Sequence, residues 1–307
     1  MFVFTILVFL LALGAAYGVA YWAFRARHDR SANVGLYLLF GIPGILLAIA
    51  GLAFTVAGQD DGPLLLVIGL GLSIPLARPV RKIVSTYTPM DPASPVDMAG
   101  LCVILSGIGL LGVLFLRAPE PEEGVTAVGL ADLVIQVLFF FGLAYATVGV
   151  GFHRSVKDAT KRLGIEWPTL RTISIAVGFT FLAFLINGIA GILTEVVQPD
   201  VAEKIDQVTE DLTADVQNPL GAVVLGLSAG IGEEILLRGA VQPRFGILLT
   251  STFFALLHVQ YGLAFVLVGL FLTGVMLGVE RRYFGTTTAI MTHALFNTIV
   301  VLAQSAA

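Results

Sequence analysis

The sequence predicts an all-α, polytopic bundle of about ten transmembrane helices with both termini outside. Hydrophobic residues make up 57% of the 307-residue chain and charged residues only 12%, against about 25% in soluble domains. Apolar runs of about 20 residues recur, and each is long enough to cross the hydrocarbon core as a helix. The loops between these runs alternate between basic and acidic composition.

The first apolar run, 1–24, has no basic residues before it and is followed by Arg25, Arg27 and Arg30. Those flanks favour a retained anchor over a cleaved signal peptide. By window length, we expect the further spans at roughly 34–57, 63–77, 98–116, 127–152, 172–195, 217–240, 247–262, 263–280 and 286–303.

The basic residues are segregated along the chain. All but Arg117 and Lys204 fall after odd-numbered spans, and we therefore expect those loops to be cytoplasmic. The opposite loops are acidic, with Asp60, Asp61 and the segment 195–215. This alternation predicts an even number of spans and places both termini outside.

Two segments outside the apolar runs have distinctive patterns. Segment 154–170 is basic and contains Trp167, so it is either a helix on the anionic leaflet or a solvated connection. Segment 199–215 has apolar residues at helical spacing among acids, which predicts a short amphipathic helix on the outer side.

The seventh span carries the most unusual stretch, 230–238, with three formal charges in apolar surroundings. Charges at membrane depth are costly and usually functional. Ala222, Gly226 and Gly230 recur every four residues, which favours close approach of another helix. Glu234 and Arg238 continue this ridge, and we expect them to form an ion pair.

Glu233 lies about 100° around the helix from Glu234 and has no basic residue at i+3 or i+4. A desolvated carboxylate without a paired cation is suited to act as a general base near neutrality. The alternative is that both acids pair with basic residues from elsewhere near the cytoplasmic rim.

Two later spans supply further polar residues. His258 follows Phe254 by one helical turn, and His293 and Asn297 share one helix face. Each could be a packing residue by itself. However, Glu233, His258, His293 and Asn297 all lie about 12–18 Å from the cytoplasmic loops at 1.5 Å per residue. The sequence therefore predicts that a carboxylate, two imidazoles and an amide meet in one layer of the membrane.

These motifs together resemble the signature of the CPBP family, which includes the type II CAAX prenyl endoproteases and the bacteriocin-processing and Abi immunity proteins. The signature is Glu233-Glu234-x-x-x-Arg238, Phe254-x-x-x-His258 and His293-x-x-x-Asn297. Arg162-Leu163-Gly164 followed by Pro168 resembles the usual lead-in. The resemblance implies a protease domain over 126–303, with its motif core at 217–303, preceded by accessory helices over 1–125.

Spacing and resemblance agree on peptide hydrolysis. Glu233 is the expected general base for a water held with His258, and His293 and Asn297 are the expected oxyanion donors. Glu234 and Arg238 would hold the helix, with Phe254 as a further support. We expect no metal in the catalytic step, although Glu233, His258 and His293 could bind zinc.

Two other functions remain open from the sequence: a non-catalytic immunity or scaffold protein, and an ion-coupled transporter. The expected partners are membrane lipids and a protein or peptide substrate, for which a lipidated or prenylated chain is one option; no nucleic acid is expected. The expected location is the cell membrane of a prokaryote, as a multi-pass protein.

Overall fold

The computed structural model describes residues 2–118, 120–121 and 124–305, and all regular structure in them is helical apart from one isolated bridge between Val150 and Arg154. The elements are α1 (Phe2–Arg25), α2 (Arg30–Val56), α3 (Gly62–Ser73), η1 (Ile74–Leu76), α4 (Arg78–Ser85), α5 (Pro95–Arg117), α6 (Leu130–Thr147), α7 (Val156–Leu163), α8 (Leu170–Val197), α9 (Pro199–Thr213), η2 (Ala214–Val216), α10 (Pro219–Glu234), η3 (Ile235–Val241), α11 (Gln242–Leu256), η4 (Val259–Tyr261), α12 (Phe265–Phe284) and α13 (Thr286–Gln304).

The predicted all-α membrane bundle is confirmed, and each of the ten expected spans contains a helix. Within the described residues, seven helical stretches are long and apolar enough to cross a membrane, and the bent pair α3–α4 would make eight. The stretch Pro219–Leu256 counts there as one, and α12 is not counted. The chain is therefore a multi-pass integral membrane protein.

Several predicted boundaries were wrong. The seventh span continues past 240 into α11, and the break comes at Gly246, whose φ of 77° and ψ of 175° suit glycine almost alone. The eighth predicted span, 247–262, corresponds to α11, which ends at Leu256, so His258 lies in the following turn. Helix α12 runs to Phe284, which brings Arg281 and Arg282 into a helix instead of a loop.

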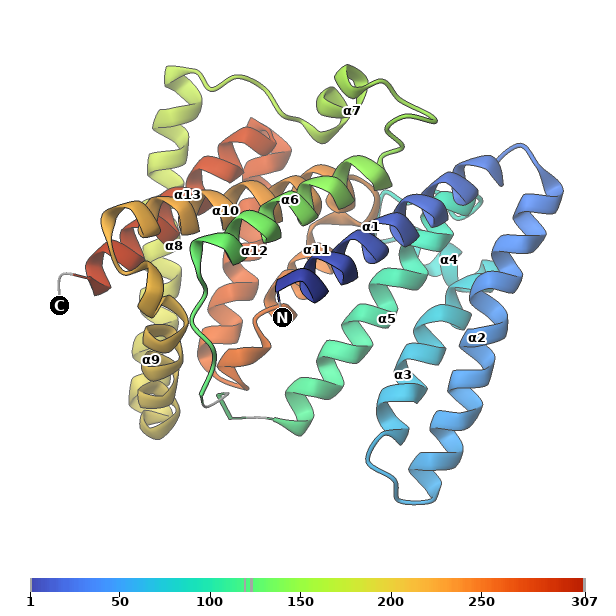
Figure 1. Cartoon of the computed structure of the whole chain (residues 1–307), viewed down its shortest axis with the longest axis horizontal. Coiled ribbons are helices and arrows are strands. Elements are labelled where there is room, and N and C mark those ends of the chain that lie inside the picture. Colours follow the sequence, from blue (N-terminus) through green and yellow to red (C-terminus); the bar gives the residue numbers. More distant parts are fainter. Residues whose placement is uncertain (1, 119, 122–123, 306–307) are drawn as a thin grey trace.

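Arg238 was also misplaced by the charge pattern, which assigned it to a cytoplasmic loop. It lies in the π-helix η3 and is fully buried. It therefore belongs to the interior of the bundle. The segregation of charge holds for the true loops: α7 and the α1–α2 turn lie at the upper edge of Figure 1, while the α2–α3 turn and α9 lie at the lower edge.

The two segments outside the spans both pack on the bundle. Helix α9 buries Ile205 and Val208, as its amphipathic pattern predicts. Helix α7 buries Ala159 and Leu163, while Trp167 after it stays 93% exposed. Segment 154–170 is thus a connection with a docked helix.

Two groups of helices lie side by side in Figure 1, with α1–α5 on one side and α8–α13 on the other. Helices α2 and α3 pack along each other, and α3 packs on α5. Helix α1 also contacts α6, and α5 also contacts α11. An ion pair between Asp97 on α5 and Arg244 on α11 joins the two groups. In the second group, α10 packs mainly on α13 and α6.

Candidate active site

The small-residue ridge of α10 brings the acidic motif against α13. A Cβ atom added to Gly226 would lie 2.5 Å from the Ala294 carbonyl oxygen, and one added to Gly230 would lie 2.7 Å from that of Ile290. Both distances are too short for any side chain without a shift of the backbone. The predicted close approach is therefore present, and its partner is the helix that carries His293 and Asn297.

Glu234 is the fully buried centre of the polar cluster. Its Oε2 lies 3.3 Å from Nε of Arg238, so the predicted ion pair is present. Its Oε1 lies 2.9 Å from Nδ1 of His293, a contact that the sequence did not indicate. Because an ionised carboxylate only accepts hydrogen bonds, Nδ1 of His293 carries the proton of this bond.

The π-helix η3 begins directly after Glu234 and contains Arg238. Wider π turns inside α-helices are rare and are frequent at functional sites. Arg238 reaches α12, where Nη2 donates to the Gly274 carbonyl oxygen at 3.1 Å. Its guanidinium carbon lies 4.8 Å from the centroid of the Phe254 ring.

Phe254 is the residue on which the three motifs meet. Its ring centroid lies 5.0 Å from that of His258 and 5.9 Å from that of His293. Together with Arg238, these residues come from η3, α11, the turn after α11, and α13. The buried ring thus holds both imidazoles at the end of the α10 acid motif.

His258 occupies the turn after α11, and its Nδ1 lies 3.0 Å from the Phe254 carbonyl oxygen. A carbonyl can only accept, so Nδ1 is the donor and the neutral ring keeps a lone pair on Nε2. The early end of α11 therefore sets the tautomer of His258. The ring as a whole is half-buried.

Glu233 is half-buried, and its Oε2 atom is buried without a hydrogen-bond partner among the described residues. Asn297 follows His293 by one turn on α13 and is half-buried. These two side chains retain free polar atoms for a substrate or a water.

A zinc site would need Glu233, His258 and His293 to converge on one point. Within the part of the chain that the structure describes, no group of three histidine, cysteine, aspartate or glutamate side chains is close enough to hold a metal ion. The bonds from the two Nδ1 atoms to Glu234 and to the Phe254 carbonyl would leave Nε2 of each ring free to coordinate, as in many histidine metal sites. Because the three side chains nevertheless do not converge, this arrangement does not fit a three-ligand zinc site, and no reaction step is assigned to a metal.

Glu280 is a buried acid that sequence reasoning missed. It is fully buried on α12, and its Oε1 accepts a hydrogen bond of 2.6 Å from the hydroxyl of Thr292, the residue before His293. Its Oε2 is buried without a partner among the described residues. The predicted span 263–280 ended at this residue, directly before Arg281 and Arg282, and the true length of α12 was the signal that could have found it.

An apolar cavity of about 490 Å³ separates the accessory helices from this cluster. Its walls come from α1, α2, α5, α6, η3 and α11, and include Ala20, Ile104, Leu143, Leu236, Phe253 and Leu257. None of the motif side chains lines it. However, Leu237, Phe253 and Leu257 line it and are the direct chain neighbours of Arg238, Phe254 and His258, so the cavity reaches the backbone beside these motif residues.

Comparison with known families supports the resemblance. Residues 215–299 match the family described as type II CAAX prenyl endopeptidase Rce1-like. The matched region contains all three motifs, from Glu233 to Asn297. No curated protein and no solved structure matches the chain.

Proposed function

We propose that the protein is an intramembrane endopeptidase that uses a water activated by Glu233, and the match of residues 215–299 to the Rce1-like family supports this proposal. The observation that carries this proposal is the convergence of Arg238, His258 and His293 on the Phe254 ring, directly beside the acid pair. Three separate segments supply these groups, and a packing role alone would not require both imidazoles there.

The proposed reaction begins with a water held between Glu233 and Nε2 of His258. Glu233 takes a proton from this water as the water oxygen bonds to the scissile carbonyl carbon. The same carboxyl group then gives the proton to the leaving nitrogen as the carbon–nitrogen bond breaks. The free Oε2 of Glu233 and the fixed tautomer of His258 support this step.

His293 and Asn297 are proposed to donate hydrogen bonds to the oxyanion. For His293 to donate from Nε2 while Nδ1 bonds Glu234, the ring must carry both protons. Glu234 supplies the balancing negative charge at 2.9 Å. Preorganised donors of this kind typically contribute about 10²–10³-fold to kcat. Glu234 and Arg238 then act by holding His293 and the helix end in place.

The substrate is proposed to be a protein or peptide that reaches the site from within the membrane. The neighbouring cavity of about 490 Å³ has apolar walls and could accept a lipid chain or apolar side chains near the cut. A lipidated or prenylated peptide is therefore the first substrate to test.

The test is cleavage of a quenched prenylated peptide by the purified full-length protein in detergent. We expect the wild type to cleave and Glu233→Ala to lose activity by at least about 10³-fold, since the general base is removed. Glu203→Ala, which removes an exposed carboxylate from α9, is the matched control and should keep full activity. Undiminished cleavage by Glu233→Ala would contradict the mechanism.

A zinc chelator added to the same assay tests the role of a metal. We expect cleavage to continue unchanged. Loss of cleavage that zinc restores would instead make the imidazoles metal ligands, and direct measurement of bound zinc in the purified protein would show this independently of activity.

A further inference from the structure

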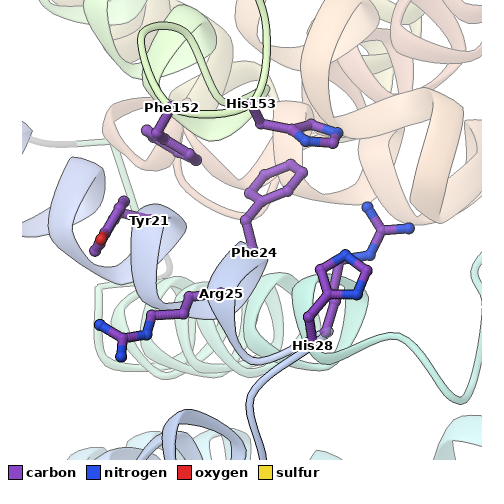
Figure 2. Close-up of a pocket in the computed structure, with 7 residues that line it drawn as sticks. Tyr21, Phe24, Arg25, His28, Phe152 and His153 are labelled. Carbon is purple, nitrogen blue, oxygen red and sulfur yellow. The ribbon is translucent and has the colours of Figure 1, made fainter.

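A second pocket, remote from the catalytic cluster, opens on the basic face where α1 ends. It has a volume of about 230 Å³ and is lined by Tyr21, Phe24, Arg25, Arg27, His28, Phe152 and His153. Figure 2 shows the rings of Phe24 and Phe152 reaching into it, with His28 and His153 on one side and Tyr21 on the other. Its walls thus join the end of the first span to the connection between α6 and α7.

Positive charge is in excess around this pocket. Arg25 is paired with Asp29 at 3.1 Å, but Arg27 and His28 have no ion-pair or hydrogen-bond partner among the described side chains. Arg154 does not line the pocket but contacts its wall, with its guanidinium carbon 5.9 Å from the centroid of the Phe24 ring. Arg244 adds further positive charge, and its own carboxylate partner is Asp97.

The effect of this charge is visible at His153. Burial, followed by the charges of Arg154, Arg27, Arg244 and His28, lowers the pKa of His153. Its ring packs against Phe24, with centroids 4.4 Å apart. An anion in the pocket would offset the repulsion among these cations and would favour the protonated form of His153.

We propose that this pocket binds the phosphate group of an anionic phospholipid. The position favours a lipid over a soluble anion, because the pocket lies where the candidate span Ile6–Arg25 ends and its tyrosine and phenylalanines resemble an interfacial aromatic belt. A pocket of about 230 Å³ holds a headgroup but not acyl chains.

The bound lipid would connect the accessory helices to the protease domain. Its headgroup would bridge α1 and the α6–α7 connection, which otherwise meet through aromatic contacts such as Tyr21 with Phe152, at 5.5 Å between centroids. Charge-assisted bonds to phosphate are stronger than neutral ones. Anionic lipid should therefore raise the stability of the whole bundle.

The experiment uses the full-length protein in nanodiscs of phosphatidylcholine containing a trace of spin-labelled phosphatidylglycerol or spin-labelled phosphatidylcholine. The wild type should immobilise the phosphatidylglycerol probe preferentially. Arg27→Gln/His153→Gln should reduce this preference about tenfold, since a hydrogen bond to a charged group typically contributes at least about that much to binding. The control Lys157→Gln/Arg171→Gln removes two exposed charges from the same face outside the pocket and should leave the preference unchanged.

Three results would overturn the proposal. One is equal preference in the pocket variant and the wild type. Another is a wild-type preference that does not fall with rising salt, because exposed phosphate contacts are screened. The third is loss of the preference on adding millimolar inorganic phosphate at constant ionic strength, which would assign the pocket to soluble phosphate. These measurements need no catalytic activity, so they are independent of the proposed peptidase reaction.

Discussion

At the scale of single residues, the candidate site depends on how one buried carboxylate divides its two oxygens. Glu234 contacts Arg238 with one oxygen and His293 with the other. Glu233, its neighbour on a different helix face, has no ion-pair partner in the part of the chain that the structure describes. The surroundings of the two adjacent acids thus differ, which is the basis for the separate roles proposed for them.

Replacing Glu234 with glutamine tests this division. Glu234→Gln keeps the size of the side chain but leaves Arg238 buried without a counter-ion, which typically costs about 3–5 kcal/mol. We expect a lower midpoint of thermal unfolding in detergent and a fall in kcat of at least about tenfold, since His293 loses its charged partner. Glu210→Gln on the exposed face of α9 is the matched control. Wild-type stability in Glu234→Gln would mean that the ion pair contributes nothing.

Glu280 provides a second test among the buried acids. Glu280→Gln keeps an oxygen that accepts the Thr292 hydroxyl at short range, whereas Glu280→Ala leaves that hydroxyl only the longer contact of 3.3 Å with the Ala176 carbonyl oxygen and opens a cavity. We expect the alanine variant to lose about 2–4 kcal/mol of unfolding free energy and the glutamine variant clearly less. Equal losses in the two variants would rule out the hydrogen bond as the source of the effect.

At the scale of elements, the decisive features are the glycine contact of α10 with α13 and the π-helix that follows. The contact determines how far the acids stand from His293, and η3 turns Arg238 towards α12. Without a close approach of the two backbones, the 2.9 Å bond between Glu234 and His293 could not form.

Gly230→Ala should therefore separate the two helices. The new Cβ would lie 2.7 Å from a backbone oxygen, and overpacking of this kind costs about 1–3 kcal/mol. We expect at least about a tenfold loss of kcat, since displacement by about 1 Å can cost 10²-fold. Gly188→Ala on α8 is the control, because its added Cβ meets nothing within 4 Å. The control should be as stable as the wild type or slightly more so.

At the scale of the whole molecule, the group α1–α5 is joined to the later helices by contacts of α1 with α6 and of α5 with α11, and by the pair Asp97–Arg244. Asp97 is buried, and its Oδ2 also accepts the backbone N–H of Asp91 at 2.8 Å. The apolar cavity lies at this same boundary and includes Arg244 in its lining. A change in the pairing should therefore affect both stability and the shape of the cavity.

Removing this buried link should be more costly than removing an exposed one. Arg244→Gln leaves Asp97 without its cation, and we expect a loss of about 3 kcal/mol. Arg117→Gln breaks the exposed pair with Asp61, at 3.9 Å, and should cost at most about 1 kcal/mol. Thermal unfolding of both variants in the same detergent measures the difference. Equal effects would show that the link does not hold the two groups together.

The sequence by itself determined the class of the protein, most of its helices and the identity of the motif residues. Hydrophobic runs must become helices in a membrane, because the bilayer core offers no other partners for backbone polar groups. Small residues at every fourth position of α10 likewise predicted a close helix contact, and Glu234 and Arg238 at i,i+4 predicted their ion pair. These features are local or periodic, so they can be recognised along the chain.

Only the tertiary structure decided the Glu234–His293 bond, the buried position of Arg238, the turn at His258 and the inclusion of Glu280. Each depends on contacts between residues that are distant in sequence, and on a break at Gly246 and a π-helix that hydropathy does not encode. Charged residues near span ends look alike in sequence whether they face water or the interior. Packing distinguishes them, because a buried charge persists only where another helix supplies its partner.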